Sequence, residues 1–242
     1  MPYIKCTIKA GNTVEIKKYF SARYGKKCRR SARRAETEDK QKRVNENNAE
    51  DKLRWLINSN FNIGDLYLTL TYGGKLPPKR EEAARILETY IRRLRRAYRK
   101  RGKELKYIAV TEYKANRIHH HIIVNDIDHK IISSLWNEGK IHFETLYSAD
   151  FSKLASYLIK ETNRTYKDGT VSGKRWNASR NLTQPEIHKE VIKADSWREI
   201  PQDTKEYTIQ ADSIVNGFDY YGYPYQKYIM IKNKSNVLHR LI

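Results

Sequence analysis

Hydrophobic residues occur in short clusters whose spacing alternates between that of strands and that of helices. Residues 65–72 (DLYLTLTY) alternate β-favouring side chains and stop at Gly73-Gly74, which predicts a buried strand followed by a turn. Residues 79–101 carry an apolar stripe at helical spacing, which predicts a helix. Residues 105–113 and 118–125 predict the two strands of a hairpin, because only a short turn separates them.

The remaining segments give weaker patterns. Residues 36–60 predict a helix that docks by its second half, and residues 149–162 predict an amphipathic helix that Ser148 or Asp150 could cap. We further expect a strand at 1–10, a helix at 128–137, a strand at 140–145, a loop at 166–185, and strands at 207–215 and 225–232 around Asn216-Gly217.

The length of 242 residues suits one domain or two small ones with a buried core. We expect a basic arm and helix at 1–60, a core at 61–165 and an extension at 166–242, with both flanking parts packed on the core. No segment approaches the roughly 20 apolar residues of a membrane span, so we expect a soluble protein of the cytoplasm. Cys6 and Cys28 are the only cysteines, which excludes a zinc ribbon or a disulfide framework.

Charge changes this picture, because 48 Lys and Arg oppose 28 Asp and Glu, a net charge of +20 that makes nucleic acid the default partner. Residues 1–35 hold eleven basic residues and one acid, and residues 79–106 hold twelve and four. The alternative is ordinary solvated surface. Candidate contacts to the DNA backbone are Arg29, Arg30, Arg33, Arg34, Arg92, Arg96, Arg117, Lys153 and Arg180.

Three consecutive histidines lie in the second strand of the predicted hairpin. Successive side chains of a strand point to opposite faces, so His119 and His121 share one face and His120 lies on the other. A turn centred on residues 115–116 would place Glu112 directly opposite His119. A carboxylate and two imidazoles on one face suit Mn²⁺ or Mg²⁺ better than a structural zinc ion, whereas the alternative is a histidine cluster without a ligand.

The predicted helix at 149–162 contains Tyr157 and Lys160, which are three residues apart and project from neighbouring positions. The pattern is weak by itself, because other tyrosines here are also followed by Lys or Arg three residues later. Tyr157 differs from them in following the histidine hairpin and in lying at the border of the apolar stripe.

The strand Leu66–Tyr72, the segment His119-His120-His121 and Tyr157-Leu158-Ile159-Lys160 resemble, in order and spacing, the three motifs of the HUH endonucleases. The chain is most similar to rolling-circle replication initiators of plasmids, phages and mobile elements. The resemblance implies an α+β fold with a ferredoxin- or RRM-like, roughly five-stranded antiparallel sheet flanked by helices. One departure is His120, because the family usually has a bulky hydrophobic residue at that position.

The resemblance implies that Tyr157 attacks a phosphodiester of single-stranded or hairpin origin DNA and forms a 5′-phosphotyrosine link, assisted by Lys160 and a metal ion on Glu112, His119 and His121. The chain has no phosphate-binding loop of the Gly-x-x-x-x-Gly-Lys type, so a host helicase and a host polymerase would be partners in a bacterial cell. The alternatives are a relaxase, a transposase of single-stranded DNA, or a basic nucleic-acid-binding protein without catalysis.

Overall fold

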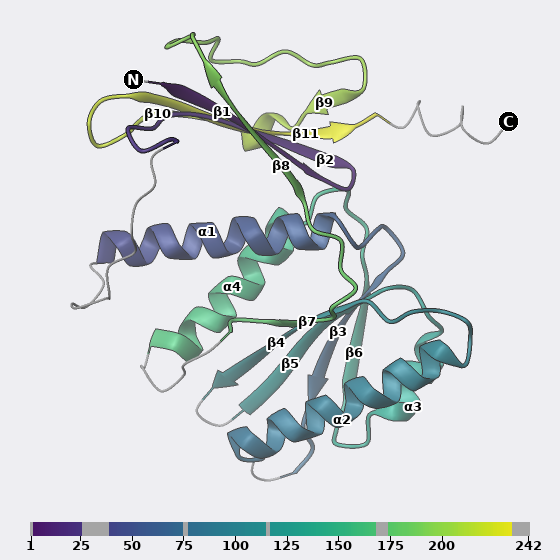
Figure 1. Cartoon of the computed structure of the whole chain (residues 1–242). Coiled ribbons are helices and arrows are strands. Elements are labelled where there is room, and N and C mark those ends of the chain that lie inside the picture. The colour runs from purple at the N-terminus through teal and green to yellow at the C-terminus, as the bar shows by residue number, and fades with distance from the viewer. Residues whose placement is uncertain (1, 26–38, 75–76, 115–116, 168–173, 234–242) are drawn as a thin grey trace, which may run out of the picture. The chain divides into compact units, whose positions relative to one another are not determined.

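The computed structural model describes residues 2–25, 39–74, 77–114, 117–167 and 174–233 (Figure 1). The chain divides into two compact units. Unit 1 comprises residues 1–45 and 184–242, and unit 2 comprises Glu46–Thr183. No helix in the described part of the chain is long and apolar enough to cross a membrane.

Unit 2 is built on a five-stranded antiparallel sheet with the strand order β6-β3-β5-β4-β7. Its strands are β3 (Leu66–Thr71), β4 (Tyr107–Lys114), β5 (Arg117–Val124), β6 (Ile141–Thr145) and β7 (Asn177–Ala178). The α+β class and the sheet of about five antiparallel strands are therefore confirmed. The hairpin β4–β5 occupies the middle of this sheet.

Helices cover both faces of the sheet in unit 2 (Figure 1). On one face, α2 (Arg80–Arg99) and α3 (His129–Leu135) pack on Leu68, Leu70 and Ile122. On the other face, α1 (Asp39–Asn58) and α4 (Ser152–Lys167) pack on Tyr67, Ile108 and Ile123. Burial on both faces explains why apolar residues stand next to one another in β5 rather than alternating with polar ones.

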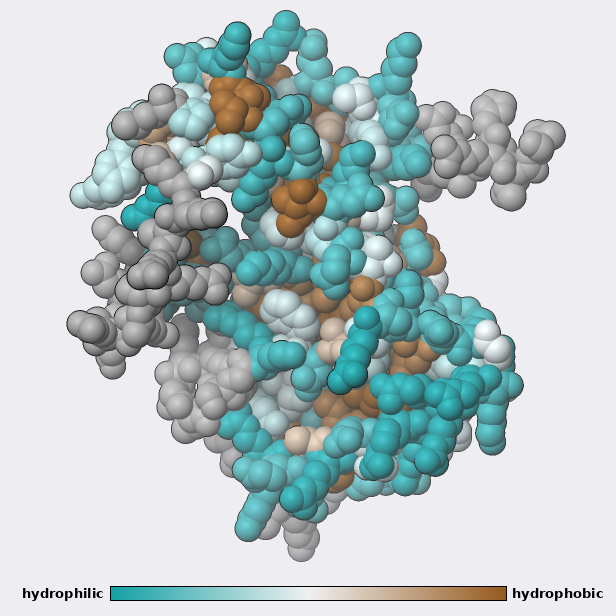
Figure 2. Space-filling model, viewed as in Figure 1, coloured by the Kyte–Doolittle hydropathy of each residue, from teal (hydrophilic) through white to brown (hydrophobic). Residues whose placement is uncertain are grey.

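The predicted helices and strands of unit 2 all exist, with ends that differ by a few residues. The loop predicted at 166–185 was wrong in one place, because it contains the short strand β7, which pairs with β4. The largest shift is at α4, which ends at Lys167 rather than at residue 162 and begins at Ser152 rather than at residue 149. Asp150 caps this helix, because its Oδ2 accepts a hydrogen bond of 3.3 Å from the backbone N–H of Ser152. Hydrophilic side chains cover the exposed side of α2, as its apolar stripe requires (Figure 2).

Unit 1 is a six-stranded sheet that joins the two ends of the chain. Its order is β10-β11-β2-β1-β8, and β9 pairs with β11. The strands are β1 (Tyr3–Ala10), β2 (Thr13–Phe20), β8 (Glu186–Ile192), β9 (Tyr207–Ile209), β10 (Val215–Phe218) and β11 (Pro224–Lys232), with a short 3₁₀ helix at Ala211–Ser213. The expected packing of residues 1–60 and 166–242 on the core stays a prediction.

The C-terminal segment differs from the expectations in three ways. The single strand predicted at 207–215 is divided into β9, the 3₁₀ helix and the first residue of β10. Strand β8 lies just after the predicted loop, and its mostly exposed residues give no clear hydrophobic pattern. The turn expected at Asn216-Gly217 lies instead at residues 219–223, where Asp219 Oδ1 accepts hydrogen bonds from the backbone N–H groups of Tyr221 and Tyr223, both 2.9 Å. Gly217 is inside β10, where a Cβ would come within 2.8 Å of the Tyr225 ring.

Candidate active site

The hairpin β4–β5 gathers three candidate metal ligands on the face that α4 covers. Glu112 is paired directly with His119, as the predicted register requires. Glu112 Oε2 is 3.7 Å from His119 Nδ1 and 3.5 Å from His121 Nε2. One carboxylate oxygen therefore lies within reach of both imidazoles.

The three side chains differ in burial. Those of Glu112 and His121 are 2% and 3% exposed, whereas that of His119 is 24% exposed. Burying a carboxylate away from water costs free energy unless a positive charge lies beside it. The two imidazoles can offset the negative charge of the carboxylate by holding a cation, and the site opens to solvent at His119.

A tyrosine from β3 holds the ring of His121. The Tyr67 hydroxyl lies 2.7 Å from His121 Nδ1, and Thr69 Oγ1 lies 3.4 Å from the same atom. Burial, followed by the charge of Tyr157, raises the pKa of Tyr67 well above its ordinary value, so its hydroxyl stays protonated. If Nδ1 carries the proton, His121 donates a hydrogen bond to the Tyr67 oxygen, and the lone pair of Nε2 points toward Glu112.

The donor set is close to the geometry that a divalent ion needs. Ligand atoms at about 2.0–2.2 Å from one ion lie about 3–3.5 Å from each other, near the two distances to Glu112 Oε2. The rings of His119 and His121 have centroids 6.4 Å apart, and no group of three His, Cys, Asp or Glu side chains in the described part of the chain is already arranged to hold an ion. His119, the most exposed of the three, would have to move for the set to close on one ion.

His120 has a structural role on the opposite face of the sheet. It is fully buried, its Nε2 lies 2.8 Å from the Tyr72 hydroxyl, and its Nδ1 lies 2.9 Å from Thr111 Oγ1. Burial, with the neighbouring histidines, lowers the pKa of His120 to about 3, so the ring is neutral. The departure from the usual hydrophobic residue is thus accommodated by two hydrogen bonds, and His120 points away from Glu112.

Tyr157 on α4 lies against the histidine face. Its ring meets that of His121 edge-on, with centroids 5.6 Å apart and an interplanar angle of 82°. The side chain is 44% exposed, so it contacts His121 and remains accessible to a substrate. Lys153 and Lys160 are exposed on the same helix, about one turn before and after Tyr157.

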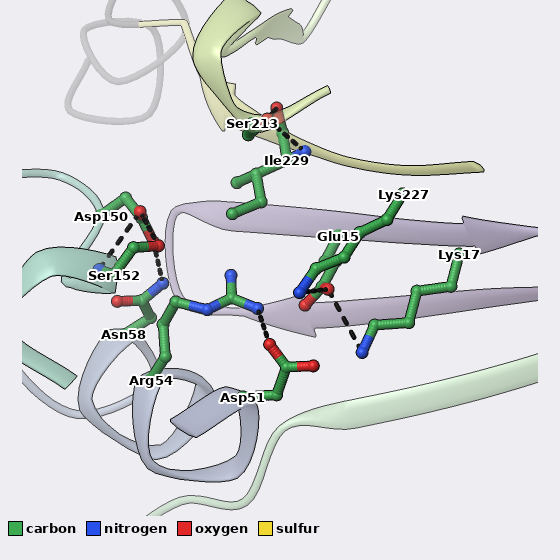
Figure 3. Close-up of polar contacts among 10 residues, drawn as sticks. All are labelled: Glu15, Lys17, Asp51, Arg54, Asn58, Asp150, Ser152, Ser213, Lys227 and Ile229. Carbon is green, nitrogen blue, oxygen red and sulfur yellow. Dashed lines mark hydrogen bonds and ion pairs between the residues drawn. The ribbon is translucent and has the colours of Figure 1, made fainter. Parts of the chain in front are cut away.

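A buried amide on α1 fixes the start of α4 (Figure 3). Asn58 Nδ2 donates to Asp150 Oδ1 at 2.8 Å, and Asn58 Oδ1 accepts from the backbone N–H of Phe151 at 3.0 Å. The helix then packs on β4 through Ala155, Leu158 and Ile159 in the hydrophobic cluster of that face. This hydrogen-bonded start sets the position of Tyr157, two turns further along α4.

The candidate DNA contacts lie in different places. Arg117 is exposed at the start of β5, two residues before His119 on the same face, and Lys153 shares the exposed side of α4 with Tyr157. Arg92 and Arg96 lie on α2, which covers the opposite face. Arg180 lies near the start of β4. The hydroxyl of the preceding residue, Ser179, accepts a hydrogen bond from the backbone N–H of Tyr107, which is five residues before Glu112 on that strand. Arg29, Arg30, Arg33 and Arg34 lie outside the described residues.

Sequence reasoning missed Tyr67, Thr69 and Asn58. The first two could have been found, because alternation in residues 65–72 places them on one face and pairing of β3 with β5 sets Thr69 opposite His121. The same row continues to His142 on β6, which is paired with Thr69. No sequence pattern pointed to Asn58, because its hydrogen-bond partners Asp150 and Phe151 are more than 90 residues away in the sequence.

Residues 65–166 match the family model described as Replication-associated protein ORF2/G2P, a family of rolling-circle replication initiators. The match begins just before β3 and ends within α4, so it includes Glu112, His119, His121 and Tyr157. It confirms the resemblance to replication initiators and supports a role in DNA replication that involves DNA binding. No curated protein and no solved structure matches the chain.

Proposed function

We propose that the protein is an HUH endonuclease that nicks single-stranded or hairpin origin DNA and starts rolling-circle replication, with Tyr157 as the nucleophile. The observation that carries this proposal is the contact between the rings of Tyr157 and His121, beside the paired Glu112 and His119. A nucleophile and a set of metal-ligand side chains then meet at one accessible point of the sheet.

In the proposed reaction the phenolic oxygen of Tyr157 attacks the phosphorus of the scissile phosphodiester. A bond forms between phosphorus and the tyrosine oxygen, and the bond to the 3′ oxygen breaks, which leaves a 5′-phosphotyrosine link and a free 3′-hydroxyl. The phenolic proton leaves with solvent, and the 3′ oxygen takes up one proton. The 3′-hydroxyl is the primer that a host polymerase would extend.

Glu112, His119 and His121 would hold Mn²⁺ or Mg²⁺, which polarises the phosphate oxygens and offsets charge in the transition state. Tyr67 keeps His121 oriented for that task through the hydrogen bond at Nδ1. Lys153 and Lys160 are exposed on the helix that carries Tyr157, and Arg117 is exposed on the strand that carries His119, so their positive charge would attract the DNA backbone.

Release of the covalent link needs a second nucleophile. The residue one turn beyond Tyr157 is Glu161, which is buried in α4, so a paired-tyrosine mechanism on this helix is not supported. Termination would therefore use another protomer or a water molecule as the source of that nucleophile. Strand separation would use a helicase in the cytoplasm of a bacterial host.

The test is formation of a covalent protein–DNA adduct. Purified protein with Mn²⁺ is mixed with labelled single-stranded oligonucleotides tiled across the replicon that encodes it, and the products are separated on a denaturing gel. We expect one oligonucleotide to give an adduct that chelator and Tyr157→Phe both abolish. Tyr147→Phe is the matched control, because Tyr147 is 86% exposed and lies outside the site.

Two results would contradict the proposal in different ways. An adduct that survives Tyr157→Phe would move the nucleophile to another residue. Absence of any adduct across the tiled DNA, with Glu112→Ala and His121→Ala proteins binding DNA as well as the wild type, would favour a nucleic-acid-binding protein without catalysis.

A further inference from the structure

The exposed side of α2 carries a straight stripe of four arginines. Arg85, Arg92, Arg96 and Arg99 are all exposed, and at 100° per residue they fall within about 60° of the helix circumference and span about 21 Å. The buried residues of the helix, among them Leu87 and Leu94, lie on the opposite side and pack on the sheet.

This stripe lies on the wrong face of the sheet to touch the DNA that Tyr157 would cut. The helix α2 packs on Leu68, Leu70 and Ile122, whereas Glu112 and His121 lie on the face that α4 covers. The five-stranded sheet therefore separates the arginines from the candidate active site (Figure 1). A strand in the active site cannot account for this excess of positive charge.

The arginines also repel one another. Arg92 and Arg96 are four residues apart and Arg96 and Arg99 are three apart, which are unfavourable spacings for like charges on a helix. Further basic residues, Arg93, Arg95 and Lys100, flank the stripe, and the acids of the helix are confined to Glu81, Glu82 and Glu88 nearer its start. Arg92 donates to Thr89 Oγ1 and Arg93 to the carbonyl oxygen of Leu135, which are neutral partners. Glu81 and Glu88 stand four residues before Arg85 and Arg92, which is a favourable spacing, so the excess of positive charge is greatest in the second half of the stripe, at Arg96 and Arg99. A bound polyanion would relieve the repulsion.

The surface suits double-stranded DNA better than a single strand. Binding of unpaired bases uses exposed aromatic rings, and the aromatic residues of α2, Tyr90 and Tyr98, are buried at 2% and 0% exposure. The surface is a rigid convex helix, and the major groove of duplex DNA is wide enough to admit one.

We propose that α2 binds the backbone of duplex DNA on the face of the sheet opposite Tyr157. A single copy of unit 2 would then hold the double-stranded part of an origin on one face of its sheet and cut a single strand on the other face. The inference deepens the proposed function and rests on it for the identity of the DNA. The contacts are to phosphates, so they contribute affinity and register rather than base recognition.

The experiment compares two variants of the full chain with equal loss of charge. The stripe variant carries Arg→Gln at positions 85, 92, 96 and 99, which keeps good helix formers throughout. The control variant carries Lys→Gln at the exposed positions 9, 52, 193 and 205. Circular dichroism and melting temperature confirm that both are folded, and affinity for a 30-base-pair duplex is measured between 50 and 200 mM salt.

We expect the stripe variant to lose about 3–4 units from the slope of log affinity against log salt, since each phosphate contact contributes about 0.9. Over this salt range the wild type and the control variant should therefore lose about 100-fold more affinity than the stripe variant. The stripe variant should still form the Tyr157 adduct on a short single strand at the wild-type level.

Three results would overturn the proposal. The first is an equal salt slope for the stripe and control variants. The second is a stripe variant that loses as much affinity for single-stranded DNA as for duplex DNA. The third is tighter binding of the wild type to duplex RNA than to duplex DNA. Duplex affinity is measured without cleavage, so a failure of the proposed nicking activity would be seen separately, as absence of the adduct with the wild-type protein.

Discussion

Replacement of Asn58 by alanine is the sharpest test of how α4 and Tyr157 are positioned. The substitution removes both hydrogen bonds of the buried amide, at 2.8 Å to Asp150 Oδ1 and at 3.0 Å from the backbone N–H of Phe151. Asn58 is 5% exposed and Asp150 7% exposed, so water replaces these partners poorly. A buried polar group that loses its partner costs about 1–3 kcal/mol.

Two such groups are affected, one of them a carboxylate that keeps its contacts to Ser152. We therefore expect Asn58→Ala to lower the free energy of unfolding by about 2–4 kcal/mol. Because Tyr157 is carried by the same helix, adduct formation should also slow by about tenfold or more under conditions where the variant is folded.

Urea unfolding followed by tryptophan fluorescence measures the first effect, since Trp55, Trp136 and Trp176 all lie in unit 2. Asn47→Ala is the matched control, because Asn47 is exposed on the same helix and alanine there should change stability by less than about 0.5 kcal/mol. The reasoning fails if Asn58→Ala costs less than 1 kcal/mol, or if its rate of adduct formation equals that of the control.

Three further predictions concern the histidine strand. Glu112→Gln keeps the shape of the side chain but removes its charge, so calorimetric affinity for Mn²⁺ should fall more than about 100-fold, and retained affinity would exclude Glu112 as a ligand. Tyr67→Phe removes the hydrogen bond to His121 Nδ1 and should weaken Mn²⁺ binding by about 10–100-fold, whereas an unchanged affinity would leave that contact without a role. His120 has a pKa near 3 in the folded protein, and about 6.5 when unfolded, so the unfolded chain binds the extra proton between these values. The free energy of unfolding should then fall by up to about 1.4 kcal/mol per unit as pH decreases from 6.5 to 3. His120→Leu should flatten that dependence in urea titrations at several pH values, and an unchanged slope would contradict it.

Much of the candidate site follows from the sequence because strand geometry is local. The alternation of side chains placed His119 and His121 together and His120 apart, and a short turn fixed Glu112 opposite His119. The same regularity failed in β8 and β10 of unit 1, where exposed polar residues and an interior glycine resemble loop and turn. Their pairing depends on partners at the other end of the chain, which local patterns do not contain.

The sequence alone determined the chemistry that this protein can offer: a carboxylate and two histidines on one strand face, a tyrosine on a following helix, and a large excess of positive charge. Only the tertiary structure decided how these parts are arranged. Packing of α4 on β4 brought Tyr157 to His121, buried amide contacts fixed that helix, and a sheet buried on both faces placed the arginines of α2 on the side away from the tyrosine. Spacing along a chain sets which face of an element a residue occupies, but contacts between distant elements set which faces meet.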